Sequence, residues 1–266
     1  LSYPQMVRLA GGKPVFLNSS ADDGFKINIQ DLKSKISSKT KFIIINSPNN
    51  PTGRVMLQEE LLQIAEVLRE NKNIYVLSDE IYELILKKEF KHFSLASLAT
   101  DLKERIFIIN GFAKGWAMTG WRVGYLVGQK DVIKASSALQ SQSTSNVCSF
   151  VQRGALEALK VNREFFLEIN SHYDLRREVL YKGLKNIEGL FIYPPNGAFY
   201  AFPRLPNNSM TSVEFCKRIL NDYGLVVVPG KPFGDDQCIR ISCASSKEKI
   251  LDGLTRLEKG ILNYYF

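Results

Sequence analysis

The stretch FIIINSPNNPTGRVMLQEELLQIAEVLRENKNIYVLS, residues 42–78, decides the fold class. It begins and ends with continuous apolar runs, at 42–46 and 74–78, of the kind that form strands buried on both faces of a parallel sheet. Apolar residues between the runs recur at helical spacing, which predicts a helix that crosses from one strand to the next. These residues are Leu57, Leu61, Ile64, Ala65 and Leu68. The stretch therefore predicts a strand, turn, helix, strand unit of an α/β protein.

Other apolar runs extend this pattern through the first part of the chain. They lie at 15–17, 105–110 and 122–127. Because these runs are short and alternate with helix-period segments, we interpret them as further strands of one mostly parallel sheet that is covered by helices. The expected fold class is α/β, with a large domain over residues 1–165.

The second part of the chain has a different pattern. Long helical segments begin near residue 149, and FIYPPNGAFYAF at 191–202 predicts two strands around a Pro-Gly turn. A helix that Gly224 closes, the short strands in LVVVP and CIRIS, and a final helix follow. We expect a smaller α+β domain over residues 166–266, which the long helix joins to the large domain.

The composition favours a globular protein without a nucleic-acid partner. The chain has 266 residues and 45% hydrophobic content, which is enough to fill a core. Its formal net charge is +8, but the basic clusters at 33–41 and 87–91 lack the repeated basic and aromatic alternation of a single-strand binder. No apolar run reaches the roughly 18 residues of a membrane helix. The start, LSYPQMVRLAGG, has neither a signal-peptide core nor an initiator methionine, so we expect the chain to begin in mid-fold.

The cysteine pattern predicts neither a metal site nor a disulfide framework. The four cysteines form no CxxC pair, and His92 and His172 are the only histidines that could join them in a zinc site. We therefore expect no metal and a reducing cytoplasmic setting.

Polar side chains that could carry chemistry follow the predicted strands. Asn50, Asp79, Tyr82 and Lys114 each come shortly after an apolar run, and ligands of open α/β sheets bind beyond the carboxyl ends of the strands. Each residue alone has a simpler explanation, as a turn former, a helix cap, a half-buried aromatic or a loop charge. Together they suggest a lysine nucleophile, which must lose its proton far below the free pKa of about 10.4. Desolvation and a cationic neighbour such as Arg122 would achieve this.

Four motifs resemble a known family. They are NSPNNPTG at 46–53, SDEIYE at 78–83, NGFAKGWAMTGWRVGY at 110–125 and IRIS at 239–242. In this order they resemble the fold-type I, pyridoxal-phosphate-dependent aminotransferases of class I, and in particular the bacterial aspartate aminotransferases. The resemblance extends from the first residue to the last, and it implies pyridoxal 5'-phosphate as cofactor and a homodimer.

The resemblance also implies roles for the residues after the strands. Lys114 looks like the lysine that forms an imine with the cofactor aldehyde and then moves the proton between the substrate α-carbon and the cofactor. Asp79 looks like the carboxylate that keeps the pyridine nitrogen protonated, so that the ring can accept electrons. Asn50 and Tyr82 are similar to the pair that hydrogen-bonds the phenolate oxygen of the cofactor.

Two arginines complete the set that the resemblance implies. Arg122 looks like the phosphate ligand, and Arg240 looks like the group that grips the substrate α-carboxylate with help from Asn50. Two alternatives stay open, a surface salt bridge for Arg122 and an ion pair within the small domain for Arg240.

The sequence departs from the family at two places. Many relatives have a serine three residues before the lysine, where this chain has Gly111, and Ala113 precedes the lysine directly. Full-length relatives also have roughly a hundred residues upstream that hold the phosphate and stack on the cofactor ring. The chain therefore resembles an aminotransferase that lacks its N-terminal portion, and we expect residues 1–266 alone to be a poor enzyme because cofactor binding is weakened.

The expected function is transfer of an amino group from an L-amino acid, aspartate first, to a 2-oxo acid such as 2-oxoglutarate. The alternatives within enzymes are an aminotransferase for prephenate, aromatic or alanine substrates, or a cyclopropane-forming lyase of the same fold. Outside enzymes they are a ligand-sensing domain like those fused to a winged helix in some transcriptional regulators, or a degenerate structural homologue.

Overall fold

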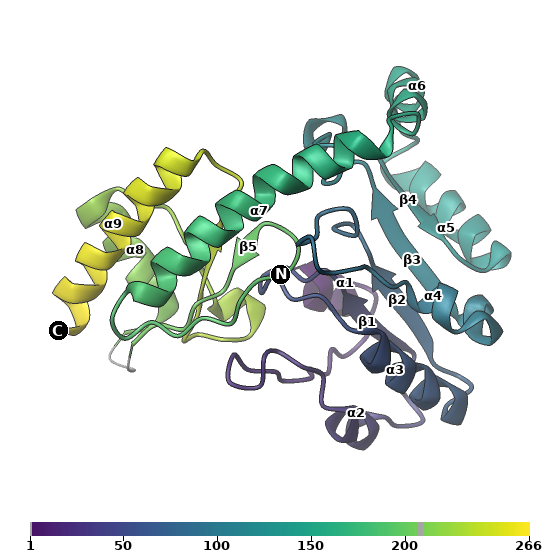
Figure 1. Ribbon diagram of the computed structural model, residues 1–266. Coiled ribbons are helices and arrows are strands. Elements are labelled where there is room, and N and C mark those ends of the chain that lie inside the picture. The colour runs from purple at the N-terminus through teal and green to yellow at the C-terminus, as the bar shows by residue number, and fades with distance from the viewer. Residues whose placement is uncertain (1, 207–209) are drawn as a thin grey trace.

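The computed structural model describes residues 2–206 and 210–266, and it contains two sheets that a long helix spans (Figure 1). Helix α7 (Arg163–Asn186) extends from the region of β4, α5 and α6 to the region of α8 and α9. Among the helices of the described residues, none combines the length and the apolar composition that crossing a bilayer requires.

The first sheet has the order β1-β2-β3-β4. Strands β1 (Phe42–Asn46), β2 (Tyr75–Asp79) and β3 (Ile106–Gly111) are parallel, as predicted. The sheet is therefore mostly parallel, as expected, while strand β4 (Gly124–Val127) is antiparallel to β3. The reason is the connection, because a parallel neighbour needs a crossover to the opposite end of the sheet, whereas a loop here turns the chain back along β3.

The predicted strand at 15–17 is not formed, so this prediction is wrong. These residues pair with no strand in the described part of the chain, and Val15 and Phe16 are more than half exposed. Only Leu17 packs against the core of the first sheet. An apolar run needs a neighbouring strand to pair with, and this segment has none.

Helices cover the first sheet, and α3 carries the predicted apolar stripe. Leu61, Ile64, Ala65 and Leu68 are each at most 2% exposed, and burying such side chains stabilises a fold by about 1.5–3 kcal/mol each for the larger ones. Leu57 precedes the helix and is exposed. The helices of this part are α1 (Ser2–Leu9), α2 (Ile29–Lys35), α3 (Gln58–Glu70), α4 (Leu95–Leu98), η1 (Thr100–Arg105), η2 (Thr119–Trp121), α5 (Lys130–Ser143) and α6 (Ser149–Ala158).

The second sheet is antiparallel, with the order β5-β7-β6, and packs with α7, α8 and α9 around its own core. Helix α8 ends at Gly224, which adopts the left-handed conformation with φ of 62°, as the sequence predicted. Its elements are β5 (Tyr200–Ala201), α8 (Ser212–Tyr223), β6 (Val228–Pro229), η3 (Lys231–Phe233), β7 (Ile239–Ser242) and α9 (Lys247–Tyr265). The domain boundary at 165/166 stays a prediction.

The predicted strand pair at 191–202 is only partly formed. Its second half contains β5, but its first half makes only an isolated bridge, between Phe191 and Arg204. The turn between the halves bonds elsewhere, because the N–H groups of Asn196 and Gly197 both donate to the carbonyl oxygen of Gly53, at 2.8 Å each. The segment after β1 and the segment before β5 therefore pack together.

A buried ion pair holds the start of α3 against the turn that follows β1. Arg54 is 5% exposed and its Nη2 lies 2.6 Å from both carboxylate oxygens of Glu60, one of which also accepts the N–H of Leu57. We expect Arg54→Ala to lower the free energy of unfolding by about 3–5 kcal/mol, because it leaves a carboxylate uncompensated in a buried site. Urea unfolding checks this, with the double variant Arg54→Met/Glu60→Leu expected to recover much of the loss. A loss below about 1 kcal/mol for Arg54→Ala would contradict it.

Candidate active site

The predicted site residues meet at the carboxyl edge of the first sheet. Asn46 and Asp79 end β1 and β2 and are paired in register, and Gly111 ends β3. Because parallel strands share this edge, the segments that leave it carry Asn50, Asp79, Tyr82 and Lys114. Arg240 reaches the same place from β7 of the second sheet.

Lys114 lies in the turn after β3 and is partly buried among aromatic rings. Its Nζ is 5.8 Å from the ring centroid of Tyr82 and 5.5 Å from that of Phe199. Desolvation by burial lowers the pKa of the Lys114 amine, and the charges of Arg122 and Arg240 lower it further. The amine thus has the environment that a nucleophile or a proton acceptor needs.

Asp79 presents a partly buried carboxyl group with few donors. Its Oδ2 accepts the hydroxyl of Tyr3 and its Oδ1 accepts the N–H of Ile81 at 3.2 Å. Burial raises the pKa of the Asp79 carboxyl, while the hydrogen bond from Tyr3 opposes this shift. The charged form of a carboxylate in such a place is stabilised by a nearby protonated nitrogen.

Tyr82 is 4% exposed, and its hydroxyl lies 3.1 Å from the hydroxyl of Tyr200. Burial raises the pKa of the Tyr82 phenol, and the hydrogen bond with Tyr200 adds to the shift. The phenol therefore stays neutral and can donate a hydrogen bond to an oxyanion.

Asn50 and Arg240 join the two sheets directly. Nη1 of Arg240 donates to Oδ1 of Asn50 at 3.0 Å, and the guanidinium lies between two rings, with Cζ 4.6 Å from the centroid of Tyr200 and 5.1 Å from that of Phe233. No carboxylate of residues 2–206 and 210–266 forms an ion pair with Arg240. The ion pair within the small domain is therefore not found.

Arg122 is exposed at the end of the Lys114 loop and adopts a left-handed conformation with φ of 54°. Its Nη1 donates to the carbonyl oxygen of Thr119 at 3.0 Å, and the Thr119 hydroxyl donates to the carbonyl oxygen of Ala113 at 2.7 Å. The alternative of a surface salt bridge is not found either, since no described carboxylate pairs with Arg122. The loop thus closes on itself and leaves the guanidinium without an anion.

Packing explains why glycine stands at position 111. Gly111 is paired with Gly124 across the β3–β4 ladder, and a Cβ at 111 would lie 2.7 Å from Cα of Gly124 and 2.9 Å from the carbonyl oxygen of Val123. A serine side chain cannot enter without moving β4. The departure from the family motif therefore follows from the close approach of these two strands.

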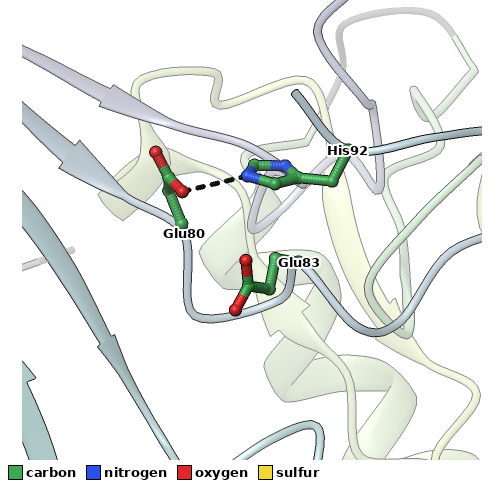
Figure 2. Close-up of side chains that lie close together, drawn as sticks. All are labelled: Glu80, Glu83 and His92. Atoms are coloured by element: carbon green, nitrogen blue, oxygen red, sulfur yellow. Dashed lines mark hydrogen bonds and ion pairs between the residues drawn. The ribbon is translucent and has the colours of Figure 1, made fainter. Parts of the chain in front are cut away.

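A polar network links the ends of β2 and β3 (Figure 2). The buried Glu80 carboxylate lies 3.0 Å from Nε2 of His92 and accepts the hydroxyls of Ser78 and Ser94, at 2.9 Å each. Glu83 points toward the same group and accepts Nδ2 of Asn110 at 2.6 Å. Asn110 directly precedes Gly111, so its bond with Glu83 ties the segment after β2 to the segment that leads to Lys114.

Three residues of the site were not predicted from the sequence. Tyr3 bonds Asp79 from a helix at the other end of this part of the chain, and Phe199 and Tyr200 contact Lys114 and Tyr82 from the second sheet. No local pattern distinguishes these aromatics from core residues. The sequence indicated only that 199–202 belongs to one of two strands around a Pro-Gly turn.

Comparisons with known proteins agree with this geometry. The family described as "Aminotransferase class I and II" matches residues 1–257. A Rickettsia felis protein named "Probable aspartate/prephenate aminotransferase" is 41% identical over 269 residues, which are 97% of this chain and 66% of the relative. The aspartate aminotransferase of Bacillus subtilis is 40% identical and is matched over 97% of this chain and 67% of its own length. The chain thus spans about two thirds of these curated relatives.

Solved structures show the same likeness. The aromatic aminotransferase of Pyrococcus horikoshii superimposes with a TM-score of 0.93 at 37% identity, over 99% of this chain and 71% of that one. A double mutant of the Thermus thermophilus aspartate aminotransferase gives 0.91 at 38% identity, over 97% and 67%. The predicted fold-type I, α/β architecture is therefore confirmed, and the chain belongs to the aminotransferase class I and II family.

Proposed function

We infer that the protein transfers the amino group of an L-amino acid, with aspartate as the first candidate, to a 2-oxo acid such as 2-oxoglutarate. The observation that supports this most is the Lys114 amine, whose pKa is lowered and which lies near two arginines that have no carboxylate partner among the described residues. An amine with a lowered pKa and two separate cations suits a substrate and a cofactor that are both anionic.

The residues present fit pyridoxal 5'-phosphate. Arg122 offers a phosphate a guanidinium that has no carboxylate partner among the described residues, and Tyr82 offers a neutral phenol for the ring oxygen. Asp79 offers a partly buried carboxyl group that a protonated ring nitrogen would stabilise. When bound, the cofactor supplies an electron sink for the pair of electrons that the α-hydrogen leaves behind.

The chain's own side chains would then divide the work. Lys114 would hold the cofactor through Nζ and afterwards accept the proton from the α-carbon of the substrate. Asp79 would keep a proton on the ring nitrogen, and Asn50 and Tyr82 would donate hydrogen bonds to the ring oxygen. Lys114 is partly buried, with its Nζ 5.5 Å from the centroid of Phe199, which limits the access of water to the amine.

Arg240 and Asn50 would orient the substrate. The guanidinium is fixed by two aromatic faces and by Oδ1 of Asn50, so its remaining N–H groups can bind the α-carboxylate with little loss of side-chain freedom. A bidentate pair with the carboxylate would hold the α-hydrogen toward Lys114.

We expect Arg240→Gln to raise the KM for the amino donor about tenfold to a hundredfold with a smaller change in kcat, because it removes charge-assisted hydrogen bonds to the substrate. Arg240→Lys keeps the charge and loses the fork, so its KM should lie between those of the parent and Arg240→Gln. Steady-state kinetics with varied L-aspartate at saturating 2-oxo acid measure this. An unchanged KM in Arg240→Gln would remove the carboxylate assignment.

The function itself is tested with the natural protein that contains this chain. With pyridoxal 5'-phosphate and 2-oxoglutarate, the amino donor L-aspartate should give glutamate. The rates with L-phenylalanine or L-alanine as the donor, and with prephenate as the acceptor, rank the alternative substrates. The names of the relatives include aspartate, prephenate and aromatic aminotransferases, so this ranking decides among them. Absence of transfer from every donor would contradict the proposal.

The remaining predictions concern context. A homodimer stays a prediction from the resemblance. A reducing cytoplasmic setting stays a prediction from the cysteine pattern. Weak activity of residues 1–266 also stays a prediction.

A further inference from the structure

Arg177 lies in α7 with its charge buried, at 3% exposure, and uses its fork on two acceptors. Nη1 donates to Oδ1 of Asp174 at 2.5 Å, and Nη2 donates to the carbonyl oxygen of Ala198 at 2.8 Å. A planar guanidinium that binds two fixed acceptors at once sets the distance and direction between them. The helix is thereby tied to the segment that enters β5.

Ala198 is held at both of its backbone polar groups. Its carbonyl oxygen accepts Arg177, and its N–H donates to the carbonyl oxygen of Ile85 at 2.9 Å. It is fully buried and has a φ of 51°, in the left-handed region that an alanine adopts only where its surroundings impose it. The backbone direction after residue 198 therefore depends on these bonds.

The two residues that follow carry aromatic rings into the candidate site. The Phe199 ring stacks on Tyr173 at 5.6 Å and lies 5.5 Å from Nζ of Lys114. The Tyr200 ring lies 4.6 Å from Cζ of Arg240. A change in the backbone at Ala198 would displace both rings, because each is attached one or two residues further along the chain.

We propose that Arg177 is a positioning residue: through the carbonyl oxygen of Ala198 it fixes the backbone that holds the Phe199 ring against the Lys114 amine and the Tyr200 ring against Arg240. Arg177 touches neither the substrate nor the cofactor in this role. The inference deepens the proposed function and rests on it for its catalytic meaning, but the placement of the amine can be tested without turnover.

The test measures the proton affinity of Lys114 in the cofactor-free protein. Amines are labelled with acetic anhydride at a series of pH values, and mass spectrometry of the Lys114 and Lys103 peptides gives a midpoint for each, since only the neutral amine reacts. Lys103 is exposed and serves as the internal reference. We expect the Lys114 midpoint of Arg177→Met to shift upward toward that of Lys103, because a displaced Phe199 ring admits water to the amine.

Two further variants separate positioning from other effects. Arg177→Lys keeps the charge but cannot hold Asp174 and Ala198 with one fork, so the Lys114 midpoint should shift upward by part of the shift seen in Arg177→Met. A midpoint equal to the parent's would overturn the proposal, because charge repulsion between residue 177 and Lys114 would then explain the effect. Leu184→Ala removes a fully buried side chain from the same helix and should leave the midpoint unchanged. An unshifted Arg177→Met, or a shift in Leu184→Ala as large, would also overturn it. Failure of the proposed function would appear separately, as lack of amino transfer by the parent protein.

Discussion

Replacement of Lys114 by alanine should lower kcat for amino transfer by about 10⁴-fold, the largest effect we expect from one substitution. The reason is that one amine is asked both to hold the cofactor and to move the proton at the substrate α-carbon. Its partly buried position near Arg122 and Arg240 lowers its pKa for both tasks. Steady-state assay of the natural protein with L-aspartate and 2-oxoglutarate measures the loss.

Arginine at the same position is the sharper control. Lys114→Arg keeps a positive charge and a long side chain, but a guanidinium does not lose its proton in proteins, so it should be as inactive as the alanine variant. Lys103→Ala removes an exposed lysine and should have parental activity. If Lys114→Arg kept more than about one hundredth of kcat, Lys114 would act as a charge and the assignment would fail.

The second largest effect should come from Asp79→Asn, with a loss of about 10³-fold in kcat. An amide has nearly the shape of the carboxyl group and can still accept the hydroxyl of Tyr3, but it cannot stabilise a proton on a ring nitrogen. Asp79→Glu keeps the charge on a longer side chain and should retain more activity than the asparagine variant. Equal kcat in the parent and Asp79→Asn would exclude this role.

The pH dependence of stability tests the raised pKa of the Asp79 carboxyl group independently of activity. Because burial raises the pKa of Asp79, the folded cofactor-free protein binds this proton more tightly than the unfolded chain does. The contribution to stability is therefore fully present below the ordinary carboxyl pKa and is lost as the pH rises through the raised one. Relative to Asp79→Asn, the parent should lose stability from acidic to neutral pH, as measured by urea unfolding of both proteins. A difference that does not change with pH would show that this carboxyl group has an ordinary environment.

Local patterns predicted most of the first sheet and led to most residues of the candidate site. The stripe of α3 was visible because its apolar residues are needed for the core, and Asp79 and Lys114 were visible because functional groups follow strand ends. Helix α5 was not predicted because it has no fully buried residue, so no strong apolar stripe marks it. The direction of β4 depends on how the loop after β3 turns, which the run 122–127 does not encode.

The unpredicted site residues depend on distant packing. Tyr3 reaches Asp79 over 76 positions of the chain, and Tyr200 reaches Tyr82 over 118. Nothing in the neighbouring sequence of either tyrosine specifies its partner, since the contact exists only after the sheets and helices have assembled. Arg240 and Asn50, which are 190 positions apart, were expected to act together because of the resemblance to a family, and no local pattern indicated their contact.

The junction at Gly53 limits how freely parts of such proteins can be exchanged. A Cβ at Gly53 would lie 2.5 Å from both Cβ of Pro195 and the carbonyl oxygen of Tyr200. The carbonyl oxygen of Gly53 also accepts hydrogen bonds from the N–H groups of Asn196 and Gly197. A chimera that takes residues 166–266 from one relative and the rest from another would therefore need a glycine on one side and a matching turn on the other. We therefore expect such a chimera to fold only when the two contacting segments match each other. Asn50 and Arg240 lie on opposite sides of this junction, so they should be exchanged together.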